Sequence, residues 1–240
     1  MTVVVALKAG DYLQPRGRHL AFEQGIVMAG DSRISYIGGS LPPEDDHAKV
    51  DSINDFAIAG YAGNRSLATS VLSRLEEAVL KQGDFSPDSV ALLAQRMLVA
   101  ADLSASALPL VHRRVQMLLG IRDCKTQKFV LYEMRTDNGF TPKPRDGMVA
   151  IGSHGHYVKS IFEQVRDVAT KLPGDPFKGP RVTLKDNLAP FVCLLLDKAL
   201  ETASEVEGQK SLIGGQTHLV VLHSRGVEAM NPDENTRLRI

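Results

Sequence analysis

The 240-residue chain contains no tryptophan and only two cysteines, Cys124 and Cys193. Two cysteines cannot build a dense disulfide framework or a thiolate metal cluster. Lys and Arg number 28, as do Asp and Glu, so no overall field attracts nucleic acid or an anionic membrane. The sequence also has no signal peptide pattern and no apolar run near the roughly 18 residues of a membrane helix. These absences predict a cytoplasmic protein without nucleic-acid or membrane partners.

The order of apolar patterns predicts an α+β protein with one domain over residues 1–240. Helices are expected in pairs rather than after each strand, which favours antiparallel layers over a wound parallel sheet. The predicted strands are Thr2–Lys8, Gly25–Ala29, Phe56–Tyr61, Arg114–Arg122, Lys128–Met134, Met148–Gly152, Thr217–His223 and Gly226–Met230. The predicted helices are one carrying Leu67 to Val79, one from Ser86 to about Ser104, one from Ser153 or His154 to Lys171, and one from about Asn187 to Glu205.

The first predicted strand begins at Thr2, directly behind the initiator Met. Cells commonly remove Met before a small residue, and we expect this to expose Thr2 as the first residue. Its α-amine titrates near pH 8, so a fraction is neutral at physiological pH and can accept a proton. A hydroxyl nucleophile and a general base would then share one residue.

Other polar residues stand at strand ends where they can support this chemistry. Asp31 and Arg33 follow directly after the strand Gly25–Ala29, at its mouth. The charge of Lys49, if it lies near the nucleophile, would lower the hydroxyl pKa. The sequence predicts Gly60 at a strand-to-helix junction, where its N–H can face a substrate carbonyl. Ser153 stands at a second such junction and can bond the terminal amine or relay a proton.

Five stretches in this order resemble β-type proteasome subunits, particularly the bacterial HslV peptidases, in the N-terminal nucleophile hydrolase superfamily. The stretches are Met1–Val5, Val27–Arg33, Lys49–Val50, Ala59–Gly63 and Ala150–Gly155. The resemblance implies a four-layer αββα sandwich and a threonine peptidase that needs no metal or cofactor. It further implies peptide substrates, homo-oligomeric rings and an ATP-dependent unfoldase partner.

The resemblance also assigns roles to residues of this chain. Thr2 is the implied nucleophile, Lys49 lowers its pKa with Asp31 as ion-pair partner, Gly60 donates to the oxyanion, Ser153 supports the amine, and Arg33 braces the site. Ile34, Ser35 and Ile58 are implied to line the substrate cleft, which predicts an apolar pocket.

Some features depart from the family pattern. The segment Asp11–Gln24 is about a dozen residues longer than the usual tight turn; we expect a protruding loop or a long hairpin tip that contacts another subunit. Lys210 and Ile213 stand where an Asp and a Ser support the amine in eukaryotic-type subunits, and His154 replaces a turn glycine. These differences favour a divergent bacterial-type member.

Two alternatives to a peptidase remain open from the sequence. The chain could be a non-catalytic subunit of the same fold, in which Asp31, Arg33 and Lys49 form a structural ion-pair network. It could also be an amidohydrolase that acts on a small amide. His154 and His156 could form a metal pair, although no acid or cysteine lies close by in the sequence, and structural polar residues at a helix start are favoured.

Overall fold

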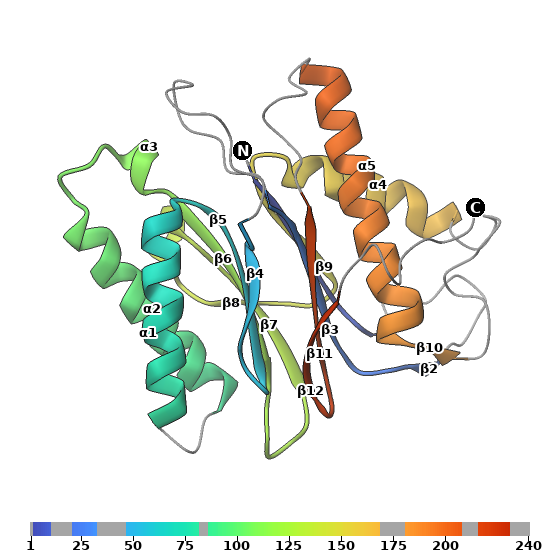
Figure 1. Ribbon diagram of the computed structural model, residues 1–240, viewed down its shortest axis with the longest axis horizontal. Helices are drawn as coiled ribbons and strands as arrows, with labels where there is room; N and C mark the ends of the chain where they lie inside the picture. The colour runs from blue at the N-terminus through green and yellow to red at the C-terminus, as the bar shows by residue number, and fades with distance from the viewer. Residues whose placement is uncertain are drawn as a thin grey trace.

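The computed structural model describes residues 2–10, 21–32, 47–81, 86–168, 181–207 and 216–230. Helices and antiparallel sheets both contribute large parts of these residues, which confirms the predicted α+β class. In Figure 1 two sheets stand face to face, with a pair of long helices on the outer side of each. Within the described ranges, no helix has the length and apolar content needed to cross a membrane.

The first sheet holds the N-terminal strand near its centre. Its strands, in spatial order, are β12 (Gly226–Met230), β11 (Thr217–His223), β3 (Gly25–Asp31), β1 (Val3–Lys8) and β9 (Met148–Gly152). All four pairings are antiparallel, and Val4 lies opposite Gly30 on one side and Ile151 on the other. Strand neighbours on both sides therefore hold the first residues of β1 in place.

The second sheet begins with an edge strand that the sequence did not predict. Its order is β4 (Val50–Asn54), β5 (Ala57–Gly63), β6 (Val115–Arg122), β7 (Phe129–Arg135) and β8 (Lys143–Arg145), again all antiparallel. The 3-10 turn η3 (Thr136–Asn138) lies between β7 and β8. Because β4 starts at Val50, Lys49 lies at its very beginning and at the edge of the sheet.

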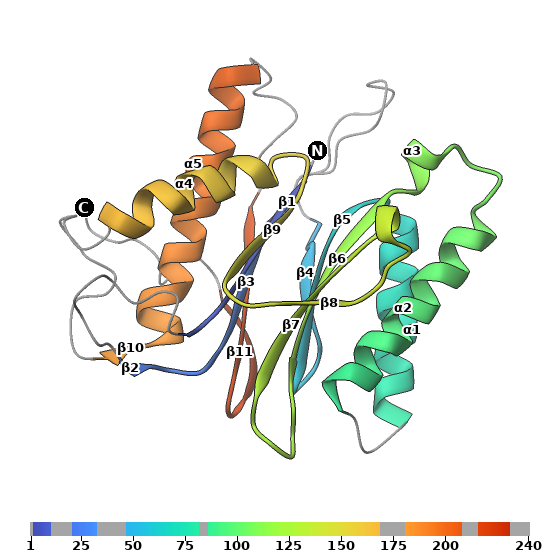
Figure 2. The same cartoon turned by 180° about the vertical axis from the view of Figure 1, so that it is seen from behind.

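Three apolar clusters separate the sheets and the helices. Figures 1 and 2 show α1 (Arg65–Lys81) and α2 (Pro87–Ser104) beside the second sheet, and α4 (Gly155–Val168) and α5 (Ala189–Glu207) beside the first. Side chains alternate along β1: Val3, Val5 and Leu7 belong to the cluster under α4 and α5, whereas Val4 and Ala6 belong to the cluster between the sheets. This alternation places the Thr2 side chain on the face toward the second sheet.

Helix boundaries follow local capping chemistry where the sequence offers it. Ser86 caps α2 by accepting the Ser89 N–H, and Pro87 follows at the first helical position. The prediction for this helix, from Ser86 to Ser104, is confirmed. The helix expected from Ser153 or His154 begins at Gly155, and its predicted end at Lys171 lies outside the described residues. The short helix α3 (Leu110–Arg113) was not predicted.

The end of the long segment Asp11–Gln24 is tied to the body of the protein. Residues 11–20 lie outside the described part, but β2 (Ala21–Phe22) pairs in parallel with β10 (Arg181–Val182). Glu23 extends this contact, because its carboxylate accepts the Leu184 N–H at 3.0 Å, where the π-helical turn η5 (Leu184–Leu188) begins. The expectation of a protruding loop is therefore wrong for residues 21–24.

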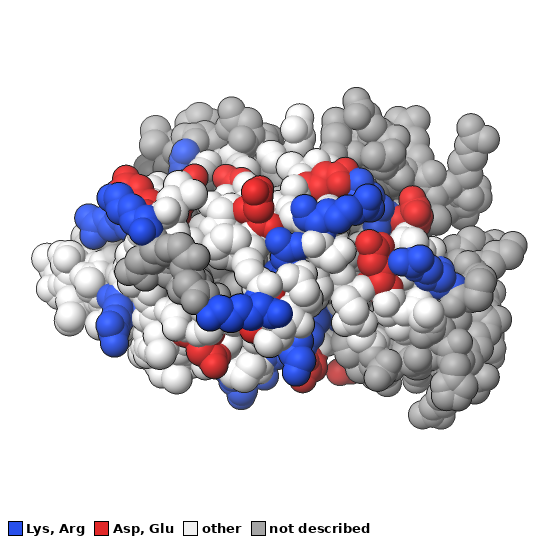
Figure 3. Space-filling view, turned by 90° about the horizontal axis from the view of Figure 1, so that it is seen from below, with Lys and Arg blue, Asp and Glu red and all other residues white. Residues whose placement is uncertain are grey.

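Charges of both signs are interspersed on the surface. On the face shown in Figure 3, Lys and Arg side chains lie beside Asp and Glu side chains across the described residues. This mixture agrees with the zero formal net charge of the sequence.

The two cysteines differ in exposure, and we expect them to differ in reactivity. Cys193 lies in the cluster under α4 and α5, where burial, and next the charge of Asp197, raise the pKa of its thiol to about 12. Cys124 is exposed. Because the thiolate is the reactive form, a thiol reagent should modify Cys124 rapidly and Cys193 only after unfolding. Titration of free thiols before and after denaturation measures this, with Cys124→Ser as control; rapid labelling of that variant in its native state would contradict the expectation.

Candidate active site

A buried carboxylate at the end of β3 joins the two sheets. Asp31 accepts the Val3 N–H on Oδ1 at 2.7 Å and the Lys49 Nζ on Oδ2 at 2.9 Å. The side chains of Asp31 and Lys49 are only 1% and 3% exposed. A Cβ on Gly30 would lie 3.2 Å from a Val4 methyl and 3.6 Å from the Lys49 Cβ, so the glycine leaves room for this approach. The ion pair predicted between Asp31 and Lys49 is confirmed.

Burial and pairing act in opposite directions on this ion pair. Burial raises the pKa of Asp31, while the Lys49 ammonium and the Val3 N–H act to lower it. Burial also lowers the pKa of Lys49, and the Asp31 carboxylate opposes that shift. Each group thus depends on the other to stay charged, and the pair lies at the start of β1, next to Thr2.

Ser153 approaches Thr2 from the other side of β1. The Thr2 nitrogen donates to the Ser153 Oγ at 3.4 Å. Ser153 lies in the turn between the end of β9 at Gly152 and the start of α4 at Gly155, so its predicted place at a strand-to-helix junction is confirmed. Four of the predicted site residues therefore meet at the start of β1: Thr2, Asp31, Lys49 and Ser153.

Two further residues, whose roles the sequence analysis did not predict, shape the turn between β9 and α4 that carries Ser153. Gly152 has φ of +97°, and a Cβ there would lie 1.9 Å from the Thr2 carbonyl oxygen, so the position requires glycine. The Gln116 Oε1, on β6 of the opposite sheet, accepts the Gly152 N–H at 2.7 Å. Gln116 thereby anchors the turn that carries Ser153. A contact across 36 residues leaves no local signal in the sequence.

The predicted position of Gly60 is wrong, because the residue lies inside β5 and not at its end. The Tyr61 N–H donates to the Lys49 carbonyl on the β4 side. Since amides alternate along a strand, the Gly60 N–H points to the β6 side, where Leu118 lies opposite. That amide belongs to the sheet and cannot serve a substrate carbonyl.

Gly63 has the features that were expected of Gly60. It is the last residue of β5 and is exposed, with φ of +102° and a following helix at Arg65. A Cβ there would lie 2.1 Å from the Arg114 carbonyl oxygen. By the same alternation, the Gly63 N–H points to the β4 side, beyond the point where β4 begins. The sequence Gly-Tyr-Ala-Gly contains two glycines, and only the strand register shows which of them ends the strand.

The predicted substrate-contacting residues are only partly described. Ile58 is fully buried in the cluster between the sheets, so its predicted contact with a substrate is wrong. Ile58 stands two residues before Gly60, and both lie in the interior of β5 and not near its end. Arg33, Ile34 and Ser35 lie outside the described residues, as do Lys210 and Ile213.

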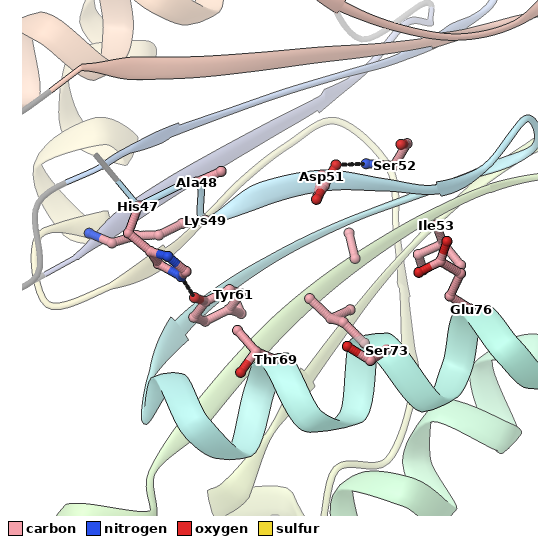
Figure 4. A pocket seen from close by; sticks show the side chains of 12 residues that line it. His47, Ala48, Lys49, Asp51, Ser52, Ile53, Tyr61, Thr69, Ser73 and Glu76 are labelled. Carbon is pink, nitrogen blue, oxygen red and sulfur yellow. Dashed lines mark hydrogen bonds between the residues drawn. The ribbon is translucent and has the colours of Figure 1, made fainter. Parts of the chain in front are cut away.

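A pocket of about 220 Å³ opens beside Lys49 on the helix side of β4 and β5. Figure 4 shows side chains from β4, β5 and α1 around it, with the Lys49 side chain extending away from those of α1. His47 and Tyr61 are hydrogen-bonded in this pocket, and burial raises the pKa of Tyr61 to about 12. The other lining residues are Ala48, Asp51, Ser52, Ile53, Ala59, Thr69, Leu72, Ser73 and Glu76. Polar and charged residues outnumber apolar ones in this lining, although apolar atoms form most of its surface. The predicted apolar pocket stays a prediction, because Ile34 and Ser35 lie outside the described residues.

The described residues contain no cluster of three metal-ligating side chains. His154 contacts the Ser153 Oγ, and the His156 ring packs on Tyr157 with centroids 4.1 Å apart. Both histidine rings pack against Tyr157, and no third metal-ligating side chain joins them among the described residues. No protein-family model matches this chain.

Proposed function

We propose that the protein is a threonine peptidase with the four-layer αββα sandwich of N-terminal nucleophile hydrolases. The observation that carries the proposal is the meeting of Ser153, Asp31 and Lys49 at the first residues of β1. A buried ion pair is costly to desolvate and contributes little net stability, so its position at the start of a strand favours a functional role. It supports an N-terminal Thr2 as the reacting group once Met1 has been removed.

In the proposed reaction, the Thr2 Oγ attacks the peptide carbonyl carbon and its proton passes to the Thr2 α-amine. The nearby Lys49 charge favours the developing alkoxide, and Asp31 holds that charge in place. The tetrahedral oxyanion collapses, the amine gives its proton to the leaving nitrogen, and an ester on Thr2 remains. Water then attacks the ester carbonyl while the amine takes one of its protons. The bond from the acyl carbon to the Thr2 Oγ breaks, the amine returns the proton to that oxygen, and the acid leaves.

Two structural features extend the proposal to substrate binding. The exposed Gly63 N–H replaces Gly60 as the oxyanion donor, because it lies at the strand end and outside the interior of the ladder. The pocket beside Lys49 receives a substrate side chain. Its exposed carboxylates, Asp51 and Glu76, favour polar or basic side chains over the apolar ones first expected.

Homo-oligomeric rings and an ATP-dependent unfoldase remain part of the proposal through the family resemblance alone, and a cytoplasmic location through the cysteine content and the lack of an export signal. A contact of the segment Asp11–Gln24 with another subunit is proposed because the segment is long and adjoins β1 and β3. Deletion of residues 13–20, which spares the paired β2, should lower the mass of the assembly in solution; an unchanged mass would remove that contact from the proposal.

The deciding experiment is the intact mass of the protein purified from its native cells. A mass without Met1 is expected, because the proposed base exists only when the Thr2 amine is free. The same sample should hydrolyse fluorogenic peptides without added metal. Retained Met1 would contradict the proposal and favour a non-catalytic subunit, whereas hydrolysis of small amides but not peptides would favour an amidohydrolase.

A further inference from the structure

His154 is a buried neighbour of the site to which the proposed reaction gives no role. It is 1% exposed and directly precedes α4. Its Nδ1 lies 3.1 Å from the Ser153 Oγ, and its ring stacks on Tyr157 with centroids 6.0 Å apart and planes 12° apart. The ring is therefore fixed in orientation, with one nitrogen directed at the hydroxyl that bonds Thr2.

The two partners of Ser153 determine the direction of its hydrogen bonds. A serine hydroxyl has one proton to donate and two lone pairs to accept with. The peptide N–H of Thr2 donates to the Ser153 Oγ and occupies one of its lone pairs. After loss of Met1, we expect the Thr2 amine to keep this contact. The hydroxyl proton is then free to be donated to His154 Nδ1, provided that this histidine carries its proton on Nε2.

This direction matters for a base made from the Thr2 amine. A neutral amine has one lone pair, and it must be open to accept the proton of the Thr2 hydroxyl. If the Ser153 hydroxyl donated to the amine, it would occupy that lone pair and compete with the reaction. With the proton donated to His154 instead, Ser153 can only accept from the amine, and the lone pair stays open.

We propose that His154 is a positioning residue that accepts the Ser153 hydroxyl proton and thereby keeps the Thr2 amine lone pair available. The inference rests on the proposed function. His154 touches neither the reacting atoms nor the substrate; it acts through Ser153. The acceptor that matters is Nδ1, and this distinguishes the role from simple filling of space.

Two matched substitutions test which ring nitrogen matters. In His154→Asn the side-chain oxygen can take the place of Nδ1, whereas in His154→Gln the amide reaches the place of Nε2. With Met1 removed, we expect kcat for a fluorogenic peptide to fall about tenfold in His154→Gln with little change in KM. His154→Asn should stay within about threefold of the unmodified chain. Equal loss in both variants, or no loss in His154→Gln, would overturn the proposal.

The tautomer of His154 gives a readout that does not depend on activity or on a folded variant. In ¹⁵N-labelled full-length protein, the ring nitrogens should show a proton on Nε2 and none on Nδ1 at neutral pH. A proton on Nδ1 would overturn the inference even if the chain is an active peptidase. If the chain with Met1 removed cleaves no peptide, the proposed function fails, and the tautomer still decides the direction of the Ser153–His154 bond.

Discussion

Replacing Thr2 with alanine is expected to reduce peptide hydrolysis by at least about a thousandfold, because removal of a nucleophile eliminates the covalent route. The fold should not change, since the backbone contact from Thr2 to Ser153 and the Val3 contact to Asp31 do not use the Thr2 hydroxyl. The measurement is the initial rate on a fluorogenic peptide, with Met1 removed in both proteins. The thermal unfolding midpoint of each protein serves as the check on folding.

Thr2→Ser is the matched control for this prediction. Serine keeps the hydroxyl and the α-amine on one residue, so it should retain a measurable part of the activity. It should also form an acyl ester, detectable by intact mass after rapid acid quench, that the alanine variant cannot form. Hydrolysis by Thr2→Ala at a rate near that of the unmodified chain would place the chemistry elsewhere in the molecule.

Replacing Lys49 with methionine is expected to lower the free energy of unfolding by about 3 kcal/mol at neutral pH. Asp31 would keep the Val3 N–H but lose the ammonium group of its ion pair, and a buried charge without its partner costs about 3–5 kcal/mol. Burial raises the pKa of Asp31 above 3.8, its unfolded value, and loss of Lys49 raises it further. The folded variant then binds the proton more tightly, so its stability falls as the pH rises above about 4. Urea unfolding at several pH values measures both effects.

A double substitution separates the ion pair from its surroundings. In Asp31→Asn with Lys49→Met no buried charge remains, so much of the lost stability should return. The exposed pair of Lys198 and Glu201 offers a comparison, because Lys198→Met should leave stability unchanged within error. A Lys49→Met protein as stable as the unmodified chain at pH 7 would show that Asp31 does not depend on this lysine.

Much of the fold could be predicted where the chain carries local signals. The strands Thr217–His223 and Gly226–Met230 were predicted with the observed bounds, because the short polar segment Ser224–Arg225 separates two runs that contain apolar residues. The strand β4 was missed, since its sequence Val-Asp-Ser-Ile-Asn exposes Asp51 and Ser52 and has little apolar content. Its place is set by pairing with β5, which is a contact and not a local propensity.

The site was predictable only as far as residue types and strand ends allow. Thr2, Asp31 and Ser153 stand at or close to the ends of predicted strands, whereas Lys49 was joined to them through the family resemblance, because β4 was not predicted. The choice of Gly60 over Gly63 failed because the sequence does not give the register of β5 against β4 and β6. Gln116 and His154 gave no indication of their role, since Gln116 acts across the sheets and His154 acts through the orientation of one ring nitrogen.

The contacts around Asp31 and Ser153 also set the order of events during synthesis. Val3 meets Asp31 across 28 residues, but Thr2 meets Ser153 across 151, so the last piece of the site leaves the ribosome long after the first. Contacts between such distant residues form late, after local helices and hairpins. A nascent chain therefore carries an incomplete site until most of both sheets has been made. If the protein is the proposed peptidase, topology itself delays its activity until the fold that encloses Thr2 is nearly complete.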